Sequence, residues 1–448
     1  MLSAQFFVSG LVIVVLLHAM LLSTAYLILL ERKTASWVQD RTGPNRTNFS
    51  FGLDDLWKKL GINGLFEGKK HLGLGQALAD GLKLFVKEDY TPPGVDKALF
   101  IAAPALAVIP ALIGWAVIPW GGLWEFPGIT LFGTELVKAG TVSVAVAPVQ
   151  IGVIYILAVS SLAVYGVVVG AYASNNKYSF LGGLRATAQM VSYEIPMGLC
   201  VLIMILTYAT PDTQLLTNLQ TAGGGGVWGI VTHPLLAIIF FICILAECNR
   251  APFDLAETEQ ELVGGFHTEF SSMKWALFFL GEYMHMIAGS AFFCVLFLGG
   301  WSFNPFGGWI SSIGPIPLAL PTTADGFWLG LLLVVVKIGI FAVKVFLLLF
   351  LMMWVRWTLP RLRFDQLMKL AWRGLIPLML LMLLLSGFII FLDLPAEKFW
   401  LFVANIVLLL VGMFVGPRLP QGPPVNRRIP LAGSRYSPLE SEATPGPA

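Results

Sequence analysis

The stretch HPLLAIIFFICILAECNRAPFDLAETEQELVGGF, residues 233–266, joins an apolar run directly to a cluster of acidic residues. A helix that spans a membrane needs about 20 mostly apolar residues, because lipid offers no partners to backbone polar groups. The apolar half therefore predicts a membrane-embedded segment that ends near Glu247. The acidic half contains a single base, Arg250, among five carboxylates: Glu247, Asp254, Glu257, Glu259 and Glu261.

The rest of the chain has the composition of a membrane protein. Of its 448 residues, 57% are hydrophobic and only 12% are charged, whereas soluble domains carry about 25% charged residues. We therefore predict an all-α fold, a polytopic transmembrane helix bundle of about nine spans within residues 1–416. The apolar runs lie near 5–30, 97–119, 149–171, 190–209, 233–248, 275–299, 327–355, 372–392 and 398–416.

The positive charges predict how these spans are oriented. Between the first two spans lie eleven of the 28 Lys and Arg residues, whereas the 210–232 and 300–326 loops have none. Cytoplasmic loops are enriched in Lys and Arg, so we predict an outside N-terminus and a cytoplasmic C-terminus in the cytoplasmic (inner) membrane. The acidic stretch, taken as 246–270, then faces the cytoplasm. The proline-rich residues 417–448 predict a disordered tail.

A second helix type is expected between the first two spans, at residues 72–88. Leu74, Leu78, Leu82 and Phe85 recur at helical spacing on one face. The opposite face carries polar and charged residues: Gln76, Asp80, Lys83 and Lys87. This pattern predicts an amphipathic helix in the plane of the membrane interface on the cytoplasmic side. An ordinary anchoring helix with snorkelling lysines would give the same pattern.

Several classes of function are disfavoured by the sequence. The net charge of +2 gives no basic surface for nucleic acid. The four cysteines have no CxxC spacing, so neither a zinc site nor an iron–sulfur cluster is implied. We find no phosphate-binding loop, dinucleotide fingerprint or catalytic triad. The chain thus shows no redox centre of its own, and no metal or flavin site.

Ionisable residues also occur inside the predicted spans. They are Glu194, Glu247, Glu282 with His285 on one face, and Lys337 with Lys344 on one face. Each costs roughly 2.5–3.5 kcal/mol at mid-bilayer, so such residues usually face a bundle interior or a wet cavity. Paired charges that lock helices together are the alternative. Acids and bases on several helices favour a proton or ion path.

The acidic stretch itself is predicted to bend at membrane depth. Glu247 and Arg250 are three residues apart and could pair on a helix, but Pro252 disfavours helix at Ala251. The following acids would line a loop or short helix, where crowded carboxylates share protons. A freely solvated loop is the alternative, which the apolar residues up to Phe266 disfavour.

Six segments of the chain resemble, in order, the signature segments of one family, the H subunits of NADH–quinone oxidoreductase (respiratory complex I). The resemblance covers about residues 30–400. The segments are ERKTASWVQDRTGPNR (31–46), LADGLKLFVKE (78–88), LRATAQMVSYEIP (184–196), AECNRAPFDLAETEQELVGGFHTEF (246–270), ALFFLGEYMHMI (276–287) and WVRWTLPRLRFDQLM (354–368).

The resemblance implies a membrane subunit of a proton-pumping translocase of the respiratory chain. Quinone, either ubiquinone or menaquinone, would bind in a chamber near the first span, the interfacial helix and the sixth span. Peripheral quinone-module subunits on the cytoplasmic side would reduce it, and small membrane-arm subunits and lipid would be the other partners. Carboxylates in the bundle would couple the reduction to proton translocation.

The resemblance also implies two groups of site residues. The quinone-chamber group comprises Glu31, Arg32, Trp37, Arg41, Asp80, Lys83, Lys87, Phe253, Arg361 and Arg363. The proton-coupling group comprises Arg185, Glu194, Glu247, Arg250, Asp254, Glu257, Glu259, Glu261, Glu282, Lys344, Arg356 and Asp365.

The chain departs from the family pattern in its longer 46–71 segment, which is either a solvated insertion or an extra contact with a peripheral subunit. Two other functions remain as alternatives. One is the homologous subunit of an energy-converting hydrogenase-type proton pump, which the full quinone-access segments disfavour. The other is a stand-alone ion-coupled transporter, which the acidic loop and the lack of internal repeats disfavour.

Overall fold

The computed structural model describes residues 3–47, 58–59, 73–131, 134–221, 226–256, 259–305, 327–393 and 395–415. The chain divides into two compact units, Met1–Leu408 and Leu409–Ala448. Within the second unit, the described residues are the last turns of its helix, up to Val415. Apart from the end of this helix, all features discussed below lie in the first unit. The predicted tail and most of the 46–71 segment lie outside the described residues.

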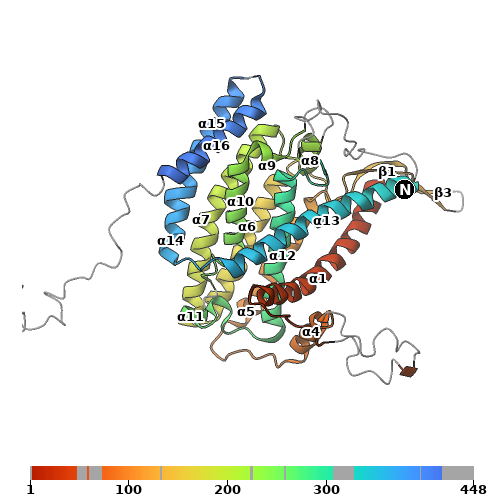
Figure 1. Cartoon of the computed structure of the whole chain (residues 1–448). Helices are drawn as coiled ribbons and strands as arrows, with labels where there is room; N and C mark the ends of the chain where they lie inside the picture. Colours follow the sequence, from red (N-terminus) through yellow and green to blue (C-terminus); the bar gives the residue numbers. More distant parts are fainter. Residues whose placement is uncertain are drawn as a thin grey trace, which may run out of the picture. The chain divides into compact units, whose positions relative to one another are not determined.

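Long helices dominate the fold, which confirms the predicted helical membrane bundle (Figure 1). Among the described residues, eight helical segments are long and apolar enough to cross a membrane. They are α1 (Ala4–Val38), α5 (Lys97–Gly114) with the one-turn helix η2 (Trp115–Val117), α6 (Gly152–Ala173), α7 (Lys177–Tyr208), α12 (Ser272–Phe297), α13 (Phe327–Thr358), α14 (Phe364–Lys369) continued through η5 (Leu370–Leu375) into α15 (Ile376–Phe391), and α16 (Glu397–Val415).

A ninth apolar helix, α10 (Pro234–Glu247), occupies the position of the short predicted span. Its 14 residues extend about 21 Å at 1.5 Å per residue, which is less than the ~30 Å hydrocarbon core. Its flanks are short elements: α8 (Thr213–Thr221) and α9 (Gly229–Thr232) precede it, and α11 (Glu259–Leu262) and the 3-10 turn η3 (Gly265–His267) follow it.

The start of α7 differs from the prediction. We expected residues 172–189 to form a loop, but the helix begins at Lys177, where the Asn176 side chain caps it by accepting from the Tyr178 backbone N–H. The hydropathy pattern did not predict the first half of α7, because small residues replace large apolar residues there. Gly183 lies close to Ala171 of α6, where an added Cβ would meet the alanine methyl at 2.3 Å.

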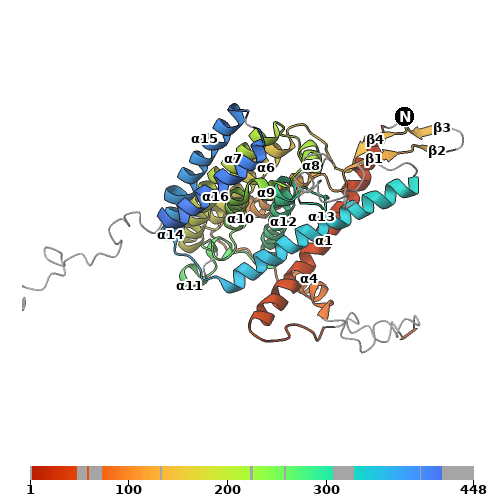
Figure 2. The same ribbon diagram turned by 45° about the horizontal axis from the view of Figure 1, so that its top comes forward.

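The 120–148 connection between two predicted spans contains four short strands, which the sequence did not predict. Strand β1 (Leu123–Phe126) pairs antiparallel with β4 (Gly140–Ser143), and β2 (Ile129–Leu131) pairs with β3 (Thr134–Val137). Trp124 and Phe126 pack with Val8 and Val12 of α1 and with Val334 of α13. The strands therefore cover the first turns of α1, next to the N-terminus in Figure 2.

The connections alternate between two ends of the bundle, as the charge pattern predicted. Helices α4 (Gln76–Val86) and α11 lie at one end, and α8 and the strands lie at the other (Figure 1). The end with α4 and α11 carries the acidic stretch. That this end faces the cytoplasm stays a prediction.

Helix α4 confirms the predicted amphipathic helix. Leu78, Leu82 and Phe85 are between 50% and 71% exposed, so its apolar face is not covered by the part of this chain that the structure describes. On the opposite face, Asp80 forms an ion pair with Arg32 of α1 at 2.7 Å. This pair fixes α4 to the end of α1, and an apolar face left outward fits the proposed position at a membrane interface.

Candidate functional site

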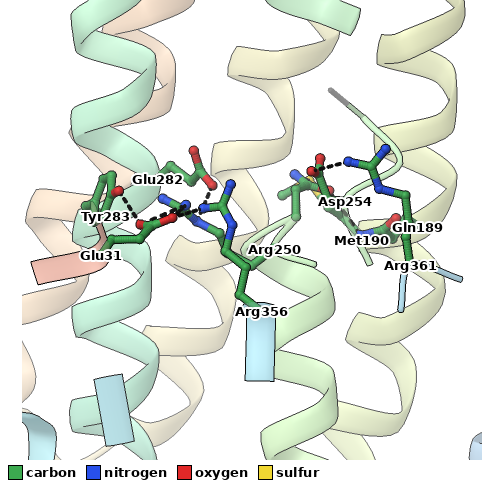
Figure 3. Close-up of polar contacts among 10 residues, drawn as sticks. Glu31, Gln189, Met190, Arg250, Asp254, Glu282, Tyr283, Arg356 and Arg361 are labelled. Atoms are coloured by element: carbon green, nitrogen blue, oxygen red, sulfur yellow. Dashed lines mark hydrogen bonds and ion pairs between the residues drawn. The ribbon is translucent and has the colours of Figure 1, made fainter. Parts of the chain in front are cut away.

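Four charged side chains from distant parts of the sequence form one cluster, which we call the four-charge cluster: Glu31, Arg250, Glu282 and Arg356 (Figure 3). Glu31 lies on α1, Glu282 on α12 and Arg356 near the end of α13, whereas Arg250 follows α10. Two acids and two bases give a formally neutral group. The sequence placed Glu31 with the quinone chamber and the other three with proton coupling, and the structure brings all four into contact.

Arg250 is the centre of this cluster. Its Nη1 atom lies 3.2 Å from both carboxylate oxygens of Glu31, and its Nε atom lies 2.5 Å from Oε1 of Glu282. Arg356 Nη1 forms an ion pair with the same Glu31. The Arg250 side chain is 3% exposed, so these charges interact in a poorly screened environment. Removing one partner of a buried pair typically costs about 3–5 kcal/mol, because the other charge is left uncompensated.

Tyr283 completes the cluster, although the sequence motifs did not single it out as a site residue. Its hydroxyl donates to Oε2 of Glu31, and its ring lies under the Arg250 guanidinium, 4.4 Å from the ring centroid. Tyr283 directly follows Glu282. A tyrosine next to a carboxylate inside a predicted span was therefore a sequence signal that could have identified Tyr283 as a site residue. The contact to the tyrosine ring helps to hold Arg250 in place, since a cation favours the face of an aromatic ring.

The turn after α10 determines where Arg250 points. Gln189 of α7 donates from Nε2 to the carbonyls of Ala246 and Phe253, at 2.8 and 2.7 Å, and to Oδ1 of Asn249 at 3.1 Å. One amide group thus ties together both ends of residues 246–253. Gln189 was not singled out from the sequence, although it lies in the RATAQMVSYE segment.

This turn corrects one expectation. Glu247 and Arg250 do not pair as helix neighbours, because α10 ends at Glu247 and the chain turns before Arg250. Arg250 instead reaches Glu31 and Glu282. Glu247 instead lines a small cavity, and Glu194 lies on α7.

Asp254, the next acid of the stretch, is held from another direction. Its Oδ2 atom lies 2.8 Å from Nη2 of Arg361, and the Leu362 N–H donates to the Pro252 carbonyl at 3.0 Å. The connection between α13 and α14 therefore fastens the acidic stretch, as Figure 3 shows for Arg361 and Asp254. Phe253, predicted for the quinone chamber, packs against Tyr193 of α7 with ring centroids 5.5 Å apart.

A small cavity of about 60 Å³ lies behind the four-charge cluster. Glu247, Glu282 and His285 line it together with His267 of η3 and apolar residues of α5, α6 and α12. Its walls are mainly apolar, but a cavity of this size has room for a few water molecules, for which these carboxylates and imidazoles offer polar partners. Burial lowers the pKa of His267 to about 4, so this imidazole is neutral at physiological pH.

A much larger, apolar cavity of about 750 Å³ lies along α1, between α1, α12 and α13. Small-molecule sites typically measure about 300–1,000 Å³ and are mostly apolar. Lys33 and Tyr26 are the polar side chains of note in its lining, and Trp37 is the predicted chamber residue that it contains. Its walls come from α1, α12, α13 and η2, with Leu74 from the segment before α4: Leu16, Ala19, Met20, Leu27, Leu30, Trp115, Ile287, Ala342 and Phe346 among others.

The remaining predicted residues lie around these features. Arg185 pairs with Glu261 at 2.6 Å, and Arg32 pairs with Asp80 as described above. Arg41 bonds to Gln39, Arg363 caps α14, and the side chains of Asp365 and Lys369 lie 3.7 Å apart on that exposed helix. Lys83 and Lys87 lie on or next to α4. Glu259 begins α11, and Glu257 lies outside the described residues.

The fold and the site define a class: a polytopic helical membrane protein with an apolar cavity beside a buried, balanced charge cluster. The sequence matches the NADH dehydrogenase family over residues 11–387. The chain belongs to the family of NADH–quinone oxidoreductase H subunits.

Three relatives document the match. The chain is 39% identical over 388 residues to the NADH-quinone oxidoreductase H subunit of Flavobacterium johnsoniae, covering 87% of this chain and 96% of the relative. It is 40% identical over 371 residues to the H subunit of Leptospira biflexa, covering 82% and 90%. It is also 40% identical over 380 residues to an H subunit of Geobacter metallireducens, covering 85% and 95%.

Proposed function

We propose that this chain, as the membrane-embedded H subunit of an NADH–quinone oxidoreductase, forms the quinone-access chamber and couples quinone reduction to proton translocation. The observation that carries the proposal is the position of the apolar cavity next to the four-charge cluster. Leu30 lines the cavity, and the next residue, Glu31, belongs to the cluster. An apolar tail in the cavity would thus bring a polar headgroup towards buried charges.

The apolar cavity and the four-charge cluster together suit the chemistry of a quinone. The cavity offers apolar and aromatic walls to an isoprenoid tail, and its burial of apolar surface is worth roughly 25 cal/mol per Å². Trp37, Lys33 and Leu74 lie at the part of the cavity nearest α4, the helix with the exposed apolar face. Lipid-soluble quinone would enter there from the membrane. No electron is passed by this chain in the proposal, since peripheral subunits would hold the redox centres.

The coupling step rests on the shared carboxylates. A change in charge at the headgroup would alter the balance at Glu31 and Arg250, and Arg250 also contacts Glu282. Glu282 lines the small cavity together with Glu247, so water there would connect the two acids. Glu194 of α7, which the sequence also assigned to the coupling group, would be the next acid of this path.

Filling the apolar cavity tests the chamber. We expect Ala342→Phe to raise the KM for a long-tailed quinone at least fivefold in the assembled complex, with a smaller effect on a short-tailed quinone. Val343→Phe is the matched control, because Val343 neighbours Ala342 on α13 but does not line the cavity. NADH oxidation by a water-soluble acceptor measures the amount of intact enzyme. Equal KM values for both variants and the unmodified complex would overturn the chamber assignment.

A further inference from the structure

Lys344 of α13 lies apart from the four-charge cluster and makes unusual contacts. Among the described residues, its Nζ atom donates to three backbone carbonyls, those of Leu298, Gly300 and Ser302, at 2.6, 2.8 and 2.5 Å. The same atom lies 4.0 Å from the ring centroid of Trp228, so an aromatic face covers it as well. The ammonium group is therefore surrounded by carbonyl oxygens and a π-system.

The Leu298 carbonyl is that of the C-cap residue of α12, whereas the Gly300 and Ser302 carbonyls lie in the turn that follows the helix. The last carbonyls of a helix have no partners within the helix, and they carry the negative end of its dipole. Leu298 is the C-cap residue, and Gly299 and Gly300 turn the chain back with φ of +60° and +53°. An ammonium group at this point donates hydrogen bonds to the carbonyls and interacts favourably with the negative end of the helix dipole.

The turn that holds the carbonyls is itself fixed. Gln220 of α8 accepts from the Gly299 N–H at 3.0 Å and donates to the carbonyls of Val295 and Leu296. The Gly300 N–H donates to the Cys294 carbonyl at 2.9 Å. The oxygens around Lys344 are therefore positioned independently of the lysine side chain, which inserts into a preformed cage.

The number of donors determines the charge state that fits this cage. A lysine ammonium has three N–H donors, one for each carbonyl. A neutral amine has two N–H groups and a lone pair, which would face a carbonyl oxygen and be repelled. Backbone carbonyls also cannot take up a proton, so these neighbours offer no onward step to a proton carried by Lys344.

We propose that Lys344 is a charged cap of the end of α12 and the turn after it, and a positioning residue for the four-charge cluster, instead of a proton carrier. This role differs from the proton-coupling role expected from the sequence. Glu282 lies 16 residues before Leu298 on α12, about 24 Å along the helix, and Arg356 lies 12 residues after Lys344 on α13, about 18 Å. The cap and the cluster thus hold the same two helices at two levels.

Two substitutions in the whole complex test the proposal, which rests on the proposed function for its activity readout. Arginine stays protonated under all relevant conditions, so it can act as a cap but not as a proton carrier. We expect Lys344→Arg to keep at least half of the quinone reductase activity and the native number of protons per electron. We expect Lys344→Met to shorten the half-life of the assembled complex at elevated temperature at least tenfold, measured as intact complex on native gels. That readout does not depend on quinone.

A proton carrier would give the reverse pattern. Lys344→Met would then be as heat-stable as the unmodified complex and pump fewer protons per electron, and Lys344→Arg would share the pumping defect. Either result would overturn the proposal.

A second pair of variants tests the proposal if an arginine at position 344 does not fit between the three carbonyls. Trp228→Phe and Trp228→Leu both remove the indole N–H that donates to Ser302 Oγ, but only phenylalanine keeps an aromatic face. The cap predicts a two- to fivefold shorter heat half-life for Trp228→Leu than for Trp228→Phe, with an unchanged pH profile of activity. Equal half-lives, or a shifted pH profile at unchanged stability, would contradict it.

Discussion

Glu31 and Arg250 lie 219 positions apart in the chain, and Nη1 of Arg250 lies 3.2 Å from both oxygens of the Glu31 carboxylate. This contact joins the first helix to the turn after α10. Glu31 also accepts from Tyr283 and pairs with Arg356, so one carboxylate connects elements from four parts of the fold. Substitutions at this contact therefore test which interactions hold the four-charge cluster together.

Glu31→Gln is expected to destabilise the complex. The substitution leaves the two arginines of the cluster with one of its two carboxylates, and a buried charge without its partner typically costs about 3–5 kcal/mol. The half-life of quinone reductase activity at elevated temperature measures the effect. A half-life equal to that of the unmodified complex would show that this cluster does not contribute to stability.

The double variant Glu31→Gln with Arg356→Gln is expected to recover part of this loss. Removing one acid and one base restores the balance of charge, so the two effects should not add. We expect the double variant to be more stable than Glu31→Gln alone. Additive losses would mean that Glu31 and Arg356 act independently, against the contact in the structure.

Gln189→Glu is expected to loosen the turn that presents Arg250. A carboxylate cannot donate to the carbonyls of Ala246 and Phe253, and it would repel both oxygens. We expect quinone reductase activity to fall at least tenfold, while NADH oxidation by a water-soluble acceptor stays unchanged. Asn249→Ala is the control, because it removes one partner of Gln189 but leaves both carbonyl contacts. Equal activities of the two variants would contradict the role of Gln189.

Glu247→Gln and Glu257→Gln are expected to impair quinone reduction, proton pumping or both, because glutamine cannot exchange a proton. Glu247 lines the small cavity, whereas the effect at Glu257 is expected from the sequence alone. Glu125→Gln is the control, since Glu125 is an exposed carboxylate on β1 and belongs to neither predicted site group. The coupling proposal fails if both variants keep native activity and native pumping.

The region around η3 is expected to lose stability in acid. The pKa of His267 is about 4 in the folded protein and about 6.5 when exposed, so the unfolded form binds the proton first. Its contribution to stability is complete above pH 6.5 and falls as the pH drops towards 4, by as much as about 3 kcal/mol. Heat inactivation measured between about pH 7.5 and 5 should show a weaker pH dependence for His267→Gln. An unchanged pH dependence would exclude His267 as its source.

Some of the structure followed directly from residue patterns. Apolar runs located the helices because each span must satisfy its own backbone and present apolar side chains to lipid. The same reasoning succeeded at α4, where apolar and charged residues separate onto two faces. It failed at the start of α7, where glycines that pack closely against α6 and η3 replace large apolar residues. It also missed β1 to β4, which are held against α1 by a few large side chains.

Composition and motifs are local properties, and they were enough to assign the class of protein, the family and most of the charged site residues. The partners of these charged residues depend on how the chain folds. Arg250 could pair with Glu247 along a helix, and it pairs instead with Glu31 and Glu282 because α10 ends first. Lys344 looked like another intramembrane charge until its three carbonyl acceptors were seen. Electrostatic interactions depend on distance and burial, and both are set by segments that lie far apart in the chain.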